Sequence, residues 1–393
     1  MKKSISNFVS AALGNRPVLW LVPALLLLVG LFGLGERLWF GKEATALTSY
    51  VPWGIWVAAY VLLVWLEVGS LIVFKVLYHT FEWKELKTIK IGVLSAGLGA
   101  LLTALFVIGM DLGQMSRGWY PFIRPNFASP MAWMIWLHVV FLAMLIIELF
   151  AVWRNDTKLE GLLYRLSLPV GILLLATVGA VFGMSAARPF WNIAALPIQF
   201  LLAALVAGMG LLVIQIGLFR HSFAAGQAES LLERLRTPFL LLLLASAGVA
   251  AVSAIVMIGP GIPAQIESLK VVLFGPYWWS FWILHIFLGV LIPILLLFFS
   301  CTRRAVVFAG ILVVVGFTGL TPNLIIPALA TGPVEALAAS YIDARLHLDY
   351  FPSRGEWLLL VFAAGMGLSI FMGVRNLLIS NLFRIQGDAR EQI

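Results

Sequence analysis

Ten apolar segments, each close to the length needed to cross a lipid bilayer, constrain this chain more than any other feature of its sequence. A bilayer core of about 30 Å requires roughly 20 consecutive apolar residues in a helix. The segments are separated by polar or proline-rich joints and lie at 17–36, 53–78, 90–111, 130–153, 164–186, 194–219, 238–260, 277–299, 304–326 and 357–380. The sequence therefore predicts an all-α, polytopic integral membrane protein with ten transmembrane helices.

The composition supports this fold class and excludes several others. Hydrophobic residues make up 62% of the chain and charged residues 11%, whereas a soluble domain carries about 25% charged residues. A soluble domain, a disordered chain, a secreted disulfide scaffold and a nucleic-acid binder are therefore excluded. The single cysteine, Cys301, also excludes an intrachain disulfide, an iron-sulfur cluster and a covalently attached haem within this chain.

The distribution of Lys and Arg over alternate joints predicts the orientation of the chain, because cytoplasmic joints retain an excess of positive charge. The side that contains both termini collects 18 of these residues and the opposite side 8. We therefore expect a protein of the bacterial cytoplasmic (inner) membrane with both termini in the cytoplasm. The net charge of +8 reflects this bias rather than an anionic partner.

The long joints fall on the outer, less basic side of the predicted membrane protein. They cover 112–129, 261–276 and 327–356 and are rich in Pro, Gly and aromatic residues. This composition is typical of an ordered docking platform, and simple helix connections are an equally consistent interpretation. If the platform interpretation is right, the partner is periplasmic.

Four ionisable residues within the apolar segments are candidate functional groups, because an unpaired charge inside a bilayer is costly. Ordered by expected depth from the outer face, they are Asp111, His138, Glu67 and Glu148. The alternative interpretation is a set of neutralised carboxylates and a structural histidine. His138 and His285 lie at similar depth, but no helix carries two histidines, as a two-haem cytochrome b would require. We expect no haem in this chain.

Aromatic residues gather at the outer end of the second helix. Tyr50, Trp53, Trp56 and Tyr60 belong to this helix or its approach, and further aromatic residues are expected at the same depth: Trp119, Tyr120, Trp133 and Trp136. Such a cluster can line a pocket for a flat apolar ring. An aromatic belt at the membrane interface explains the same pattern equally well.

Four short motifs, taken together, resemble those of the NrfD/PsrC family. They are Pro52-Trp-Gly-Ile-Trp56 opening the second helix, Asp111-Leu-Gly113 at the end of the third, Ala128-Ser-Pro-Met-Ala-Trp133 opening the fourth and Arg188-Pro-Phe-Trp-Asn192 before the sixth. The resemblance implies a single membrane domain over 1–393, with four-helix bundles at 53–186 and 194–326 and additional helices at 17–36 and 357–380. Tyr350-Phe-Pro352 before the last helix resembles the ten-helix branch, which includes the membrane subunit of Hyb-type hydrogenases.

This resemblance also implies a function and partners. Members of the family are haem-free membrane subunits of quinone-linked respiratory oxidoreductases. A periplasmic iron-sulfur subunit, and through it a catalytic subunit, exchanges electrons with menaquinone or ubiquinone near the outer face. The polysulfide-reductase branch has His, Asn and Tyr in its quinone pocket, where this chain has Tyr60, Val57 and Thr177. We expect Asp111, Gln114 or His138 to supply the polar contact that Val57 cannot make.

The sequence thus predicts a quinone site and a route for protons. The expected quinone-binding residues are Trp53, Trp56, Tyr60, Asp111, Gln114, Trp119, His138 and Thr177. Asp111 and His138 would exchange protons with the quinone, and Glu67 and Glu148 would extend the route to the cytoplasm. A secondary transporter and a purely structural membrane anchor are the alternative functions. The unbroken helix around Glu67 disfavours the former, and the buried carboxylates disfavour the latter.

Overall fold

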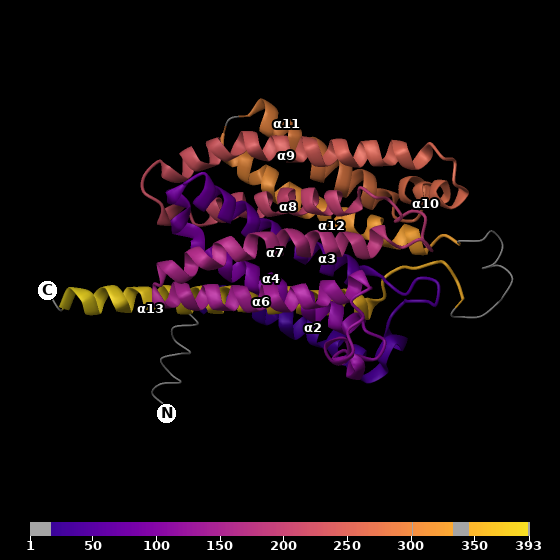
Figure 1. The fold of residues 1–393 in the computed structure, drawn as a ribbon, viewed down its shortest axis with the longest axis horizontal. Coiled ribbons are helices and arrows are strands. Elements are labelled where there is room, and N and C mark those ends of the chain that lie inside the picture. Colours follow the sequence, from indigo (N-terminus) through magenta and orange to yellow (C-terminus); the bar gives the residue numbers. More distant parts are fainter. Residues whose placement is uncertain (1–16, 301, 333–345, 392–393) are drawn as a thin grey trace.

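The computed structural model describes residues 17–300, 302–332 and 346–391, and it confirms the all-α membrane fold. The described residues contain ten helices long and apolar enough to cross a membrane, namely Val18–Ala44, Ile55–Thr80, Lys84–Asp111, Pro130–Arg154, Thr157–Gly183, Leu196–Leu218, Gln227–Ile258, Ser280–Phe299, Arg303–Leu329 and Arg354–Asn381. They run roughly along the long axis of the molecule (Figure 1). We call the end where α3 begins and α4 ends the loop end, and the opposite end, where α2 begins and α13 ends, the terminal end.

The helical elements within these spans follow the chain in a simple order. The long α-helices are α2 (Leu21–Phe40), α3 (Ile55–Lys75), α4 (Lys90–Asp111), α6 (Pro130–Arg154), α7 (Thr157–Gly183), α8 (Leu196–Leu218), α9 (Gln227–Ile258), α12 (Arg303–Leu329) and α13 (Arg354–Glu391). The eighth span combines a π-helix, η7 (Ser280–Leu291), with α11 (Ile292–Phe299). The shorter α-helices are α5 (Tyr120–Ile123) and α10 (Pro263–Phe274), and both lie in joints at the loop end.

Local sequence explains where several helices begin and end. Asn155 ends α6 in the left-handed conformation with φ of 56°, and the carboxylate of Asp156 accepts hydrogen bonds from the backbone N–H groups of Lys158 and Leu159 at the start of α7. These two residues produce the tight turn between the two helices. Ser353 and Glu356 form a reciprocal capping box at the start of α13.

We divide eight of the ten spans into two groups, with α3 and α8 at their junction. The first group is α3, α4, α6 and α7, and the second is α8, α9, η7 with α11, and α12. Gly69 of α3 faces α8 so closely that a Cβ atom there would lie 1.8 Å from the carbonyl oxygen of Ala204. Gly208 of α8 has the same role, because its Cβ would lie 2.1 Å from the backbone of Gly69. The predicted division into two four-helix bundles stays a prediction.

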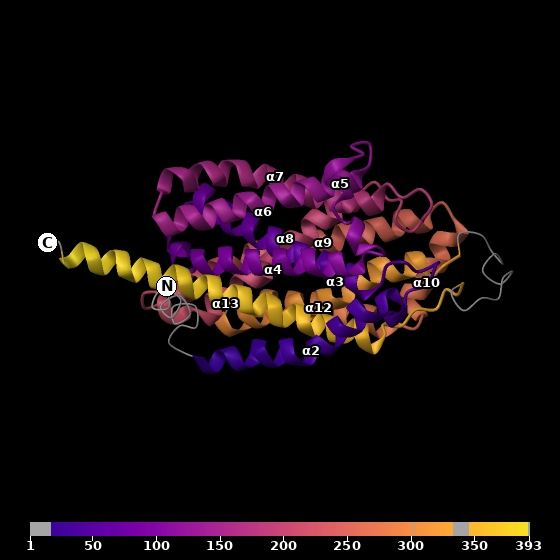
Figure 2. The ribbon, with the colours of Figure 1, turned by 90° about the horizontal axis from the view of Figure 1, so that it is seen from below.

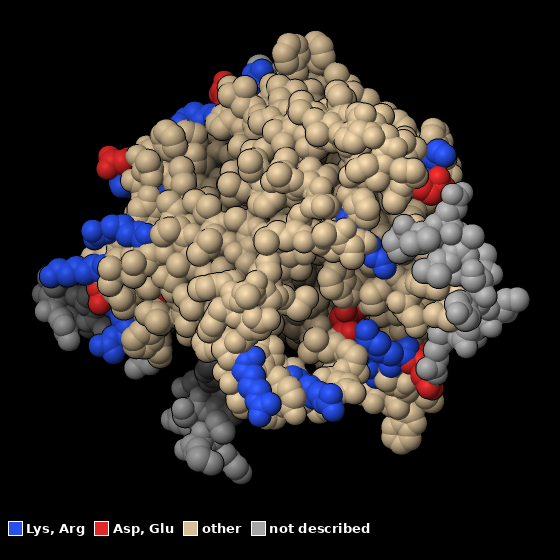
Figure 3. Space-filling model, turned by 45° about the vertical axis from the view of Figure 1, so that its right-hand side comes forward, with Lys and Arg blue, Asp and Glu red and all other residues tan. Residues whose placement is uncertain are grey.

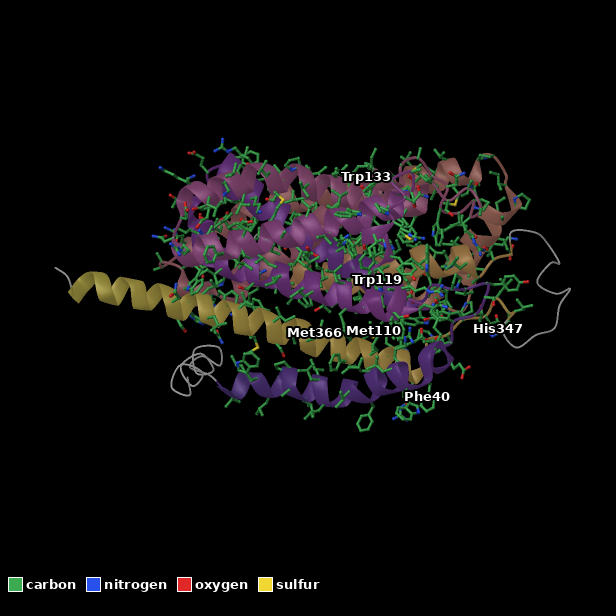
Figure 4. The ribbon with its side chains drawn as sticks, turned by 60° about the horizontal axis from the view of Figure 1, so that its bottom comes forward. Phe40, Met110, Trp119, Trp133, His347 and Met366 are labelled. Atoms are coloured by element: carbon green, nitrogen blue, oxygen red, sulfur yellow. The ribbon has the colours of Figure 1, made fainter. Side chains whose placement is uncertain are left out.

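The first and last helices form a separate pair. α2 packs along α13, and α13 packs against α4 (Figures 1 and 2). A Cβ on Gly30 would lie 2.2 Å from the backbone nitrogen of Phe362, so the pair approaches closely. Figure 4 labels Met110 of α4 and Met366 of α13 in this region, with Phe40 at the exposed end of α2. The predicted first helix ended at residue 36, whereas α2 continues to Phe40.

Burial ranks the helices from centre to periphery. In the most apolar stretch of each span, 78% of residues are buried for α3 but only 17% for the spans of α2, α9, η7–α11 and α13. The exposed side chains on these peripheral helices are largely apolar, as a lipid-facing surface requires. Figure 3 shows this uncharged surface, with Lys, Arg, Asp and Glu gathered at its margins. α3 is therefore the central helix.

The long joints at the loop end are partly helical. The joint 112–129 contains α5, and 261–276 contains α10. Of the third joint, 327–356, residues 333–345 lie outside the described part of the chain. The described remainder of that joint folds back on the loop end, where Tyr350 is buried. Cys301 also lies outside the described residues.

Candidate functional site

A hydrogen-bonded tyrosine–histidine pair lies in the first helix group, between α3 and α6. The Tyr60 hydroxyl is 3.3 Å from Nε2 of His138, and Nδ1 of the same imidazole is 2.8 Å from the carbonyl oxygen of Met134. A carbonyl can only accept, so Nδ1 carries the proton and donates it. Nε2 is then the acceptor for the Tyr60 hydroxyl. Both side chains are buried, with exposed fractions of 3% and 2%.

This arrangement leaves a lone pair on the Tyr60 oxygen for a ligand and a proton on the Tyr60 hydroxyl that can move to His138. The oxygen of Tyr60 can accept a hydrogen bond from a ligand hydroxyl while its own proton points to His138. His138, neutral in this tautomer, can accept that proton at Nε2, and the hydrogen bond from Nδ1 to the Met134 carbonyl would stabilise the resulting imidazolium. The geometry of the buried pair is thus compatible with a short proton relay between Tyr60 and His138.

Asp111 ends α4 close to the α2–α13 pair. The side chain is buried, and its Oδ1 atom has no hydrogen-bond partner within the described chain. Arg37 reaches the same helix end and donates from its guanidinium to the carbonyl oxygens of Met110 and Leu112, each at 2.7 Å. A cation at a helix C-terminus is favourable. This contact also explains why α2 extends beyond residue 36.

The predicted aromatic cluster divides between two sides of α3. Trp53 stacks on Trp191, with 5.7 Å between ring centroids, and meets the edge of Phe182 at 5.8 Å. Trp56 turns the other way, and its indole N–H donates to the carbonyl oxygen of Glu356 at 3.1 Å. Trp53 thus faces α7 and the approach to α8, whereas Trp56 faces α13. The structure does not bring the two indoles into one pocket.

The remaining predicted quinone residues lie outside the Tyr60–His138 pair. Gln114 is exposed in the loop after α4, and Trp119 is 52% exposed. Trp119 and Trp133 lie apart from each other (Figure 4). Thr177 of α7 donates its hydroxyl to the carbonyl oxygen of Leu173 in its own helix at 2.7 Å. These positions follow from helix rotation, which depth along the sequence does not specify.

Glu148 has a buried partner that sequence reasoning did not assign to it. The ammonium group of Lys75 lies 2.6 Å from Oε2 of Glu148 and donates a second hydrogen bond to Ser167 Oγ, also at 2.6 Å. The side chains are only 3% and 8% exposed. Lys75 is the last residue of α3 and lies within the predicted second helix at 53–78. Glu148 is therefore one half of a compensated ion pair.

Glu67 has no such partner. It is fully buried in α3, and neither carboxylate oxygen has a hydrogen-bond partner among the described residues. Ser95 of α4 and Gln215 of α8 are likewise buried with unpartnered side-chain atoms. Along their helices, these residues follow one another from mid-depth toward the terminal end. Buried polar atoms normally find protein or water partners, so each of these three side chains is a candidate for contact with buried water.

A second polar network, which sequence reasoning did not identify, connects α13 to the start of α3. The Tyr350 hydroxyl donates to Glu356 Oε1 at 2.6 Å and accepts from the backbone N–H of Ile55 at 2.9 Å. The backbone N–H of Ala46 donates to the other carboxylate oxygen at 2.9 Å. Tyr277 donates to the carbonyl oxygen of Tyr350. The Ser353-x-x-Glu356 capping box is the sequence signal that could have identified this carboxylate.

The pKa values of the two tyrosines in this network, Tyr277 and Tyr350, are raised. Burial, reinforced by the nearby charge of Glu356, raises the pKa of Tyr277 to about 12. The same two causes raise the pKa of Tyr350 further. Both tyrosines therefore stay neutral donors, Tyr350 to the carboxylate of Glu356 and Tyr277 to the carbonyl oxygen of Tyr350.

The described residues contain no group of three or more His, Cys, Asp and Glu side chains placed to hold a metal ion. His138 and His285 have different surroundings. The former pairs with Tyr60, and the latter lies between the rings of Phe281 and Phe317 at 5.8 and 6.2 Å.

Comparisons with known proteins bear on most of the chain. Residues 43–335, which include both helix groups, match the family model described as Polysulphide reductase, NrfD. A selenate reductase subunit of Mesobacillus selenatarsenatis is 28% identical over 390 residues, covering 88% of this chain and 89% of the relative.

Two further relatives are similar to this chain at lower coverage. The Hdr-like menaquinol oxidoreductase integral membrane subunit of Archaeoglobus fulgidus is 27% identical over 346 residues, covering 83% of this chain and 84% of the relative. A Halobacterium salinarum protein named as a dimethyl sulfoxide reductase membrane subunit is 27% identical over 249 residues, covering 55% of this chain and 56% of the relative.

Proposed function

The chain belongs to the polysulphide reductase NrfD family, and we propose that it is the membrane subunit of an oxidoreductase complex that exchanges electrons with a membrane quinone. All three relatives are named as subunits of oxidoreductases, and one name specifies menaquinol. The observation that carries the proposal is the buried Tyr60–His138 pair inside the first helix group. A quinone presents carbonyl oxygens and a quinol presents hydroxyl groups, and this relay complements both.

Conversion between quinone and quinol transfers two protons for every two electrons, and in this proposal the Tyr60–His138 pair supplies a path for the protons. When a quinol is oxidised, its hydroxyl donates to the Tyr60 oxygen while the Tyr60 proton moves to Nε2 of His138. The reverse movement serves quinone reduction. Tyr60 and Glu67 lie seven residues apart on one face of α3, about 10 Å along the helix. Glu67 is therefore the next proton acceptor that a chain of water molecules could reach. From there the proposed proton route passes Ser95 and Gln215 toward the terminal end.

Asp111 lies apart from the Tyr60–His138 pair, at the end of α4 that Arg37 contacts. Its burial and the Oδ1 atom that has no partner among the described residues suit a proton-exchanging group at the loop end. In this proposal, Asp111 connects the loop end to solvent, while Glu67 connects the pair to the opposite side. Glu148 acts as a structural anion for Lys75 rather than as a carrier.

The partner is proposed to dock at the loop end. The bias of Lys and Arg toward the terminal side of the sequence supports a periplasmic loop end with both termini in the cytoplasm. An iron-sulfur subunit at that face would pass electrons to or from the quinone, with a catalytic subunit behind it. Menaquinone is favoured over ubiquinone by the name of the archaeal relative. Assignment to the hydrogenase branch stays a prediction from the resemblance.

The test is to purify the complex from its native membrane, identify the co-purifying subunits, extract its quinone and measure turnover with a short-chain quinol. Tyr60→Phe should lower quinol-dependent turnover roughly 100-fold or more, because it removes the transferable proton. Tyr78→Phe is the matched control on the same span, since this tyrosine lies at the terminal end and stacks on Phe74. Equal turnover in wild type and Tyr60→Phe would refute the assigned relay. A complex without bound quinone or quinol-dependent turnover would refute the function.

A further inference from the structure

The second helix group encloses a cavity of about 340 Å³ that is separate from the Tyr60–His138 pair. Its walls come from α8, α9, η7 and α12, with Trp65 of α3 closing it toward the first group. Small side chains line the α9 wall, among them Ala247, Ala250 and Ala254. Ligand pockets in proteins commonly range from about 300 to 1,000 Å³. The cavity therefore has room for a small ring system.

Three polar atoms at this cavity lack partners among the described residues. They are the indole Nε1 of Trp65, Oδ1 of Asn323 and Nδ1 of His285. Trp65 and Asn323 are only 2% and 4% exposed, and the Nδ1 atom of His285 is itself shielded. Asn323 satisfies its amide nitrogen by donating to the carbonyl oxygen of Gly319 at 2.7 Å, which leaves its oxygen available. Buried atoms of this kind are normally hydrogen-bonded, so three around one cavity indicate a ligand.

The backbone around His285 is also unusual. This residue lies in the π-helix η7, and π-helical turns are rare and frequent at functional sites. η7 is held against α12 by close contact of Gly289 and Gly316, where a Cβ on Gly316 would lie 2.2 Å from the Cα of Gly289. The ring of His285 meets Phe317 edge-on at 6.2 Å, and Phe317 meets Trp65 in the same way at 6.1 Å. The polar atoms are thus set among flat aromatic surfaces.

The lining defines the chemistry of the ligand. Among the residues that the structure describes, the lining contains no Asp, Glu, Lys or Arg, so a neutral ligand fits it. The indole N–H requires an acceptor, the Asn323 oxygen requires a donor, and the imidazole nitrogen can serve either purpose. Ala250 and Ala251 on α9 line the cavity and are also exposed on the lipid-facing side, so entry from the bilayer is short. These features describe an apolar ring with carbonyl or hydroxyl oxygens.

We propose that this cavity is a second quinone-class site, in which Trp65 and Asn323 bind the head group and His285 contacts a ring oxygen. The identity of the ring rests on the proposed function, while the presence of a ligand site rests on the cavity and its unpartnered atoms. The two sites lie on different sides of α3. Tyr60 turns to α6, whereas Trp65 turns to Phe200 of α8 at 5.2 Å between ring centroids.

The test is photolabelling of the purified complex with an azido-benzoquinone that carries a ten-carbon tail, followed by mapping of labelled peptides by mass spectrometry. We expect label on α9 and η7 peptides, in addition to α3 and α6, and loss of that label when unlabelled quinone is added. Ala247→Phe fills the cavity and should abolish the α9 and η7 label. Ala245→Phe is the matched control, because this residue is exposed on the same helix and does not line the cavity.

A milder variant keeps the proposal testable if Ala247→Phe disturbs folding. Asn323→Leu preserves the size of the side chain and removes the acceptor, and it should weaken competition by unlabelled quinone roughly two- to tenfold. Label confined to α3 and α6 would overturn the second site and leave the proposed function intact. Label on α9 that resists competition, or survives Ala247→Phe, would also overturn it as partition into lipid. Label at neither site would count against the proposed function itself.

Discussion

The buried pair of Lys75 and Glu148 gives the sharpest prediction about stability. The distance of 2.6 Å and the exposed fractions of 3% and 8% mean that removing either partner leaves an uncompensated charge among apolar helices. Breaking a buried pair costs about 3–5 kcal/mol, whereas replacing both partners by apolar residues of similar volume is often neutral or stabilising. Lys75→Met and Glu148→Leu should therefore each destabilise strongly, and the double variant should recover most of the loss.

The assay is equilibrium unfolding of the purified protein in detergent micelles, analysed as a double-mutant cycle. The surface pair of Lys270 and Glu267 is the control, since its side chains are 63% and 59% exposed. Lys270→Met should change the free energy of unfolding by less than about 1 kcal/mol. The reasoning fails if the single variants at the buried pair are as stable as wild type. A stable Glu148→Gln variant that loses proton release would instead restore Glu148 as a carrier.

The central helices and the loop end yield three further predictions. Glu67→Gln should retain quinol oxidation in proteoliposomes while losing proton release on the terminal side, and unchanged proton release would exclude the route. Gly208→Ala should destabilise the protein by about 1–3 kcal/mol, because its Cβ would lie 2.1 Å from the backbone of Gly69. Gly248→Ala is the control and should have little effect, because its Cβ would meet no described atom within 4 Å. Equal unfolding midpoints for the two variants would contradict the close contact between α3 and α8. The pKa of Tyr277 is raised from 10.0 to about 12, so its contribution to the free energy of unfolding should be complete below pH 10 and be lost as the pH rises through 12. Tyr277→Phe should remove that part of the decline in unfolding curves measured against pH. An unchanged curve would exclude Tyr277 as the cause of the decline.

The sequence predicted the fold well because the signal for a membrane span is local. A run of apolar residues of the right length is sufficient to place a helix, and all ten predicted spans have counterparts in the described chain. Boundaries were less certain where a distant residue decides them. Arg37 extends α2 because it caps a helix that ends far along the chain, 73 residues away at Met110. No property of residues 17–40 alone contains that information.

The site was harder to predict because depth and rotation are different quantities. Position along a helix gave the depth of Tyr60 and His138, and the structure pairs them. Rotation decides which side chains share a pocket, and α3 is buried on nearly all sides, so its apolar pattern marks no outward face. Trp53 and Trp56 were therefore grouped by depth although they face opposite directions. The partner of Glu148 was missed for a related reason, since sequence position does not show that Lys75 and Glu148 face each other across two helices.

α3 connects every proposed chemical step in this protein. Tyr60 faces α6 on one side, Trp65 faces the cavity of the second group on the other, and Glu67 follows with unpartnered oxygens. The helix is fixed against α8 at Gly69, where the contact leaves no room for a methyl group. The two proposed sites therefore lie on opposite sides of one helix that is closely packed against the second group. If both proposed quinone-class sites exist, the second helix group, whose cavity lining contains no charged side chain among the described residues, has a binding role of its own beside that of the first group.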